Sequence, residues 1–138
     1  MGAVAIMRAI AIAGVRPAAI VLESPFDRLL NTVRQRFRAM GLNPFPGAEL
    51  MVFWGGAQQG FNGFAHNPVN YAKAIKCPTL ILHGALDRRV TIEEVTAIFK
   101  NLRGNKQLVS FANAGHATVN GSRWKQYLAQ FLSAPESQ

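Results

Sequence analysis

The chain has 138 residues, of which 49% are hydrophobic, and it carries a net charge of +8 at pH 7. This length fits one domain, and the hydrophobic content excludes a disordered polar segment. A single cysteine, Cys77, excludes an internal disulfide, and we interpret it as a small apolar core residue rather than a nucleophile. The basic residues cluster only in the segment 28–38, so we expect a solvated helix face there and not a nucleic-acid patch.

The first element is an apolar helix over residues 2–13, in which Arg8 is the only charge and which Gly14 ends. A helix that is apolar nearly all round is normally buried inside a larger fold. Charges and a proline interrupt the apolar stretch 1–22, so the pattern predicts neither a secretory signal nor a membrane span, and we expect no membrane partner. If Met1 is the true start, a cytoplasmic location is expected.

The next elements are a strand over residues 18–22 and an amphipathic helix over residues 27–40. Residues 42–67 are rich in glycine, proline and aromatic side chains, which predicts a cap-like or loop insertion; we expect a loop or short helical insertion there and no core element. Its aromatic stretch 53–64 would line an acyl pocket or lid, or else form a satellite hydrophobic cluster; the sequence favours neither.

The last third of the chain alternates between the two kinds of element. The pattern predicts a short helix over 68–75, strands over 79–82 and 107–111, a helix over 91–102 that a capping box opens, and a helix over 121–131. Alternating strands and helices predict an α/β fold with about three parallel strands and flanking helices. The first strand would leave one sheet edge bare, which suggests that structure preceding Met1 is missing.

Two candidate site residues follow neighbouring strands. Asp87 lies five residues after Leu82, and His116 lies five residues after Phe111. Because the carboxyl ends of parallel strands meet at one edge of a sheet, we expect the two side chains to lie close together. An acid placed there can hold an imidazole in one tautomer. Alone, each residue is as readily a turn aspartate or an exposed loop histidine, but their order and spacing favour a functional pair.

The segments that carry these residues resemble a known superfamily. The chain is similar to the C-terminal half of an α/β-hydrolase, the superfamily of serine esterases, dienelactone-hydrolase-like enzymes and S9-type peptidases. The matching stretches are Cys77–Gly84 with Asp87 and Val90, and then Ala114–His116. Met1–Ala5 resembles the residues that follow the nucleophile, and Ile20–Pro25 resembles the strand and loop before a cap region. The resemblance implies Asp87 as the triad acid, His116 as the general base, and the backbone N–H of Met1 as an oxyanion donor.

The resemblance also shows what the sequence lacks, since no serine stands in a Gly-x-Ser-x-Gly turn. Ser24 follows a strand but lacks the flanking glycines of a tight elbow, so it is a weak substitute nucleophile. Glu23 is a less favoured alternative to Asp87 as the acid. We interpret His66 and His83 as structural residues, and the histidine spacing predicts no metal site. The glycines at 55, 56 and 60 do not match a phosphate-binding loop, and we expect no cofactor.

These observations predict one unit, residues 1–138, that forms the C-terminal portion of a serine hydrolase domain. When whole, such an enzyme would cleave carboxylic esters or small amides; this chain alone is expected to be inactive or very weak. One alternative is a non-catalytic half-fold that associates with a complementary N-terminal half or with itself. A less favoured alternative is a basic nucleic-acid-binding module that uses the segment 28–38.

Overall fold

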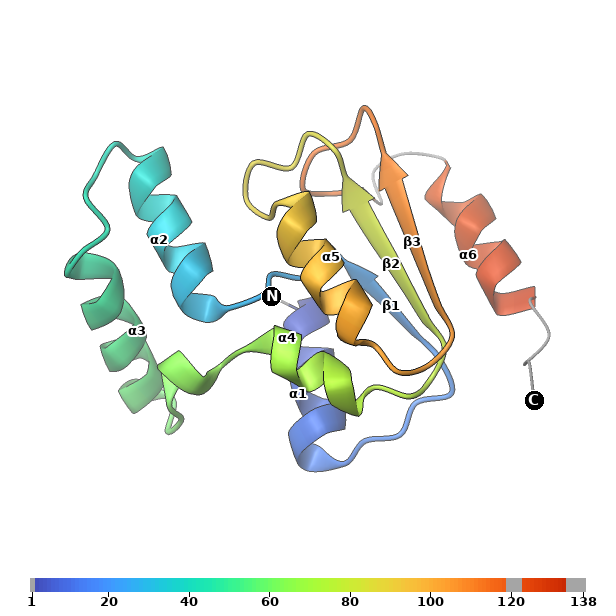
Figure 1. Ribbon diagram of the computed structural model, residues 1–138, viewed down its shortest axis with the longest axis horizontal. Coiled ribbons are helices and arrows are strands. Elements are labelled where there is room, and N and C mark those ends of the chain that lie inside the picture. The colour runs from blue at the N-terminus through green and yellow to red at the C-terminus, as the bar shows by residue number, and fades with distance from the viewer. Residues whose placement is uncertain (1, 119–122, 134–138) are drawn as a thin grey trace.

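The computed structural model describes residues 2–118 and 123–133, and it contains one three-stranded parallel sheet. The strands β1 (Ile20–Glu23), β2 (Thr79–Gly84) and β3 (Lys106–Phe111) are arranged in the order β1-β2-β3. All pairs are parallel, so the three carboxyl ends lie at one edge of the sheet (Figure 1). The predicted α/β class with three parallel strands and flanking helices is confirmed.

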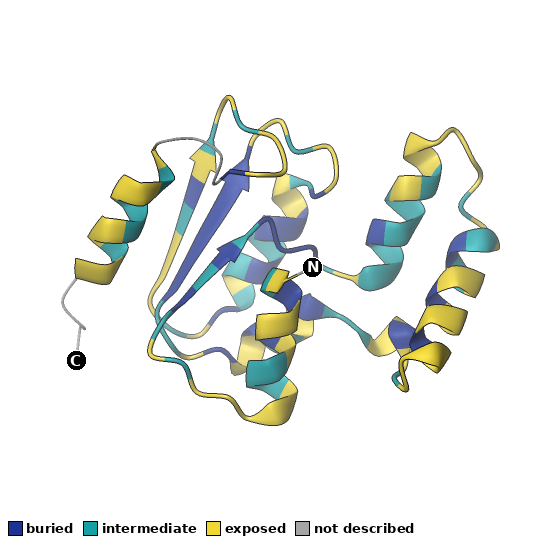
Figure 2. Cartoon of the chain, turned by 180° about the vertical axis from the view of Figure 1, so that it is seen from behind, coloured by how far each residue is buried: buried dark blue, intermediate teal, exposed yellow. Residues whose placement is uncertain are grey.

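Helices cover both faces of this sheet (Figure 1). One face packs against α1 (Gly2–Ala13), the short helices α4 (Pro68–Tyr71) and η2 (Ala72–Ala74), and α5 (Ile92–Asn101). The other face packs against α6 (Trp124–Ser133). Every residue of β2 is buried, as Figure 2 shows along the strand, because neighbouring residues point into the two different cores. This explains the unbroken apolar run from which the strand was predicted.

Helix α1 has the predicted bounds, but it buries only one stripe of its surface. Val4 and Met7 are buried against the sheet layer, whereas Ile6 and Ile12 are 43% and 65% exposed. The outer side of α1 therefore has no cover among the residues that the structure describes (Figure 2).

A helical hairpin projects beyond the sheet and consists of α2 (Leu29–Ala39) and α3 (Gly47–Gln58), followed by the turn η1 (Gly63–Ala65) (Figure 1). Arg34 of α2 pairs with Glu49 of α3 at 2.5 Å, and this pairing holds the pKa of the Glu49 carboxyl group below its usual range. The insertion predicted over residues 42–67 thus contains a 12-residue helix. Its assignment as a cap stays a prediction.

The capping box of α5 is confirmed. The hydroxyl of Thr91 accepts the N–H of Glu94 at 3.4 Å, and the Glu94 carboxylate accepts the N–H of Thr91 at 2.8 Å. Strand β1 begins two residues later than predicted and β2 continues to Gly84, whereas the start predicted for the last helix falls partly outside the described residues. None of the described helices is long and apolar enough to span a membrane.

Candidate active site

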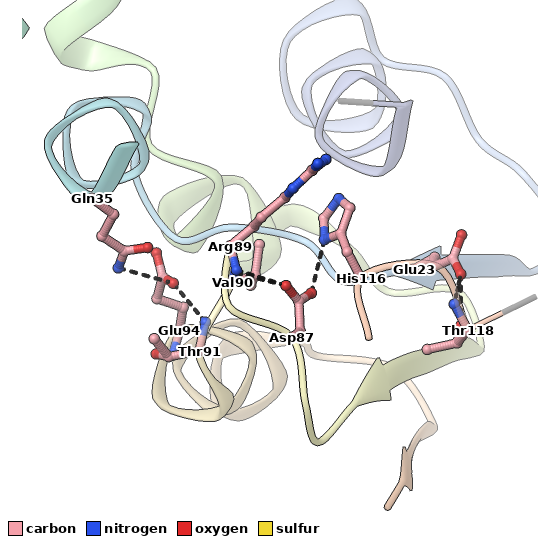
Figure 3. Close-up of polar contacts among 9 residues, drawn as sticks. All are labelled: Glu23, Gln35, Asp87, Arg89, Val90, Thr91, Glu94, His116 and Thr118. Atoms are coloured by element: carbon pink, nitrogen blue, oxygen red, sulfur yellow. Dashed lines mark hydrogen bonds and ion pairs between the residues drawn. The ribbon is translucent and has the colours of Figure 1, made fainter. Parts of the chain in front are cut away.

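Asp87 and His116 meet at the carboxyl edge of the sheet, as the sequence predicts. His116 Nδ1 lies 2.8 Å from Asp87 Oδ2, across 29 residues of sequence (Figure 3). The Asp87 side chain is completely buried, whereas 41% of the His116 side chain is exposed. An ionised carboxylate only accepts hydrogen bonds, so Nδ1–H is the donor and Nε2 is left as the basic nitrogen.

Backbone groups of the loop after β2 orient the Asp87 carboxylate independently of His116. Asp87 Oδ1 accepts the backbone N–H of Arg89 at 2.8 Å and that of Val90 at 3.1 Å. The Asp87 N–H in turn donates to the carbonyl of Gly84 at 2.9 Å, which closes a tight turn. With Oδ1 occupied by the backbone, Oδ2 is the oxygen presented to His116.

The same contacts determine the charge of the acid. Burial raises the pKa of the Asp87 carboxyl group, but the hydrogen bonds from His116 and from the two backbone N–H groups outweigh burial, so the pKa lies below its ordinary value. The hydroxyl of Ser24 lies close enough to lower this pKa further, without meeting hydrogen-bond geometry. Asp87 is therefore ionised at neutral pH and able to hold the imidazole.

The loop that carries His116 rests directly on the end of β2. The carbonyl of Ala114 accepts the N–H of Leu86 at 2.9 Å, which ties this loop to the loop of the acid. A Cβ added to Gly84 would lie only 2.0 Å from the carbonyl oxygen of Gly115. Only glycine at position 84 lets the histidine loop come this close.

The end of the histidine loop is tied to the first strand. Glu23, the last residue of β1, accepts hydrogen bonds from both the backbone N–H and the hydroxyl of Thr118 (Figure 3). Glu23 was predicted as an alternative acid, whereas its contact with Thr118 was not predicted. No sequence signal joins two residues that lie 95 positions apart.

Of the two remaining candidate site residues, the structure describes Ser24 but not Met1. Ser24 lies at the predicted edge with a φ of +40°, but it is only 5% exposed and its buried Oγ makes no hydrogen bond to any residue that the structure describes. A hydroxyl buried in this way is poorly placed to attack a substrate, which favours a structural role. Met1, the expected oxyanion donor, lies outside the described residues.

The surroundings of His83, His66 and Cys77 favour structural roles for these residues. His83 is 2% exposed, and burial lowers its imidazole pKa. His66 packs against the rings of Phe26, Phe61 and Tyr71, and burial lowers its pKa as well. Cys77 is half-buried, and burial raises the pKa of its thiol, which disfavours the nucleophilic thiolate. Within the described residues, no group of three or more candidate ligands could hold a metal ion.

A cavity of about 700 Å³ lies between the histidine loop and α6. Phe111, Trp124 and Tyr127 line it together with residues of the histidine loop. The side chain of His116 is not part of its lining, so we do not place the reaction in this cavity.

Several solved structures are similar to this chain. An esterase from Pyrococcus furiosus is 25% identical, with a TM-score of 0.66 over 94% of this chain and 49% of that one. An acylaminoacyl peptidase from Pyrococcus horikoshii is 18% identical, with a TM-score of 0.65 over 95% of this chain and 22% of that one. Acetyl xylan esterase 1 from Thermoanaerobacterium sp. is 20% identical, with a TM-score of 0.56 over 83% of this chain and 37% of that one. The chain thus spans about half the length of the Pyrococcus furiosus esterase.

The comparison with protein families is the more specific one. A search of curated proteins found no match. The model of the prolyl oligopeptidase family, Peptidase S9, matches residues 42–134, a range that includes both Asp87 and His116. Because this match covers more than half of the chain, and because the structural neighbours share its arrangement of strands and helices, the chain belongs to the prolyl oligopeptidase family and has an α/β-hydrolase fold.

Proposed function

We propose that Asp87 and His116 are the acid and the general base of a serine hydrolase site that cleaves carboxylic esters or small amides. The observation that carries this proposal is the 2.8 Å contact between an exposed imidazole and a buried, ionised carboxylate at the carboxyl edge of the sheet. Family membership supports the hydrolase class, and the esterase and peptidase names of the neighbours support acyl transfer.

In this proposal, His116 Nε2 accepts the proton of a serine hydroxyl as that oxygen attacks the substrate carbonyl carbon. Asp87 stabilises the resulting imidazolium through Nδ1–H. The imidazolium then gives its proton to the departing alcohol or amine, which leaves an acyl-serine. A water molecule, deprotonated by the same nitrogen, releases the carboxylic acid and restores the serine.

The nucleophile in this proposal comes from outside the 138 residues. No Gly-x-Ser-x-Gly turn occurs in the sequence, and the chain spans 49% of the Pyrococcus furiosus esterase. We therefore expect the 138-residue chain alone to be inactive or very weak. In this proposal, a second backbone donor for the oxyanion would likewise come from outside these 138 residues.

The test compares variants of the protein as its source makes it. The intact mass is measured first, because a mass above the 15.1 kDa of this chain would show that the protein contains additional sequence. Hydrolysis of a chromogenic acetate ester should then be lost in His116→Ala and retained in His66→Asn, which removes a histidine from the aromatic cluster instead. Ester turnover that survives His116→Ala would contradict the assignment.

A second candidate role is association without catalysis, either with a complementary N-terminal half or with another copy. It is favoured by the exposed Ile6 and Ile12 of α1 and by the position of β1 at the edge of the described sheet. Gel filtration at several concentrations tests it, since a monomer at every concentration would contradict self-association. The nucleic-acid role has less support, because Arg34 already pairs with Glu49.

A further inference from the structure

The contact between Glu23 and Thr118 links the first strand to the histidine loop. Glu23 Oε1 accepts the Thr118 N–H at 2.5 Å and the Thr118 hydroxyl at 2.7 Å, and the Thr118 residue is only 2% exposed. One carboxyl oxygen that accepts two donors from the same residue holds that residue in both position and orientation. This contact therefore fixes the chain two residues after His116.

His116 thus lies between two anchors. On one side, Ala114 is bonded to Leu86 in the loop that also carries the acid. On the other side, Thr118 is bonded to Glu23 at the end of β1 (Figure 3). The five-residue segment 114–118 is short enough that fixing both ends restricts where the imidazole can lie.

We propose that Glu23 is a positioning residue for His116, which acts through Thr118 to keep the imidazole within reach of Asp87. This inference rests on the proposed function in that it treats His116 as the general base. It leaves the role of the acid with Asp87, whose carboxylate is the one paired with the imidazole at 2.8 Å.

The chemistry of the contact defines informative substitutions. Thr118 offers two donors, so the partner must accept, and Glu23→Gln keeps an accepting oxygen whereas Glu23→Ala removes it. Thr118→Ser keeps both donors, whereas Thr118→Val keeps the N–H and loses the hydroxyl. Glu93→Gln removes a negative charge from an exposed position on α5 and is the matched charge control.

The first readout is the tautomer of His116, measured by nitrogen-15 NMR in the protein as its source makes it and assigned by the loss of its signals in His116→Gln. We expect the Nδ1–H tautomer in the unmodified protein, in Glu23→Gln, in Thr118→Ser and in Glu93→Gln. Glu23→Ala should show a mixture of tautomers, because the Nδ1–H of an imidazole released from Asp87 no longer has a fixed acceptor. A general loss of packing elsewhere would not select one histidine in this way.

The second readout is ester hydrolysis by the same variants. A displacement on the order of 1 Å can cost about 100-fold in rate, so Glu23→Ala should lower kcat by about 10- to 100-fold with KM nearly unchanged. Glu23→Gln should recover most of this loss. If no form of the protein hydrolyses esters, the proposed function fails while the tautomer result still decides the role of Glu23.

Two results would overturn the inference. One is a folded Glu23→Ala protein, judged by circular dichroism, with His116 still wholly in the Nδ1–H tautomer. If Glu23→Ala does not fold, the comparison of Thr118→Val with Thr118→Ser decides instead, and identical tautomer populations in these two variants would overturn the inference.

Discussion

Gly84→Ala is the substitution that tests the geometry of the site most directly. Gly84 ends β2, and the backbone of the histidine loop crosses over it. A Cβ at this position would lie 2.0 Å from the carbonyl oxygen of Gly115 and 2.4 Å from that of Ala114. Both obstacles are backbone atoms, so no side-chain rotation can remove the clash.

The size of the displacement follows from these distances. Ordinary contact begins at 3.4 Å, so the loop must retreat by about 1.4 Å. His116 directly follows Gly115, and its 2.8 Å bond to Asp87 cannot be maintained if the loop moves this far alone. We expect a loss of about 1–3 kcal/mol in the free energy of unfolding. We also expect a fall on the order of 100-fold in kcat for the complete enzyme.

Two glycines provide controls for this experiment. Gly115→Ala changes the other side of the same contact, but its Cβ would meet no atom of the described residues within 4 Å, so pairing and activity should be retained. Gly104→Ala would place a Cβ 2.2 Å from the carbonyl oxygen of Lys76, beyond the amino ends of the strands, so it should lose similar stability while His116 keeps its tautomer. Urea denaturation and nitrogen-15 NMR measure the two effects. A Gly84→Ala protein that keeps both its stability and the Nδ1–H tautomer would refute this reasoning.

Three further predictions follow from the same structure. Ser24→Ala should leave ester hydrolysis within a few-fold of normal, because the Ser24 hydroxyl is buried and has no hydrogen-bond partner within the described part of the chain; a loss of 100-fold or more would contradict this expectation and make Ser24 a candidate nucleophile. Thr91→Ala removes the hydroxyl that accepts the Glu94 N–H in the capping box and should lower the free energy of unfolding by about 1 kcal/mol, as measured by urea denaturation. Burial lowers the pKa of both His66 and His83 below the ordinary 6.5, so the unfolded chain binds more protons than the folded one below this pH. The free energy of unfolding should therefore be highest above pH 6.5 and should fall as the pH drops from 6.5 through the lowered pKa values. Urea denaturation of His66→Gln should show a smaller loss of stability between pH 7 and pH 5.5, and an unchanged loss would contradict the assignment to His66.

Sequence analysis predicted the paired residues of the site because few physical rules decide their positions. Parallel strands put the loops that follow them at one edge of the sheet, so Asp87 and His116 had to lie near each other once both strands were identified. Strand β2 was recognisable because it is buried on both faces. The capping box of α5 is a local signal, and it was identified from Thr91 and Glu94 alone.

The features that were not predicted depend on contacts between distant residues. The glycines of the segment 42–67 favoured a loop in the sequence, yet Gly56 lies within α3. A Cβ at this position would lie 2.6 Å from the carbonyl oxygen of Phe61, so glycine is the residue that fits there. In this case close packing of the chain, and not local propensity, explains the glycine. The contact between Glu23 and Thr118 likewise joins residues that share no motif.

Gly84 and Glu23 meet two parts of one structural requirement. In the order β1-β2-β3, the first strand does not neighbour the third, so Glu23 binds the histidine loop only if that loop folds back across the end of β2. Gly84 makes this crossing possible, because any side chain there would lie in its path. Once Gly84→Ala has displaced the histidine loop, Glu23 can no longer bind Thr118 in the same way. The double variant with Glu23→Ala should therefore lose less kcat and less stability than the two single variants together, as measured by a double-mutant cycle. Strictly additive losses would mean that the two residues position His116 independently.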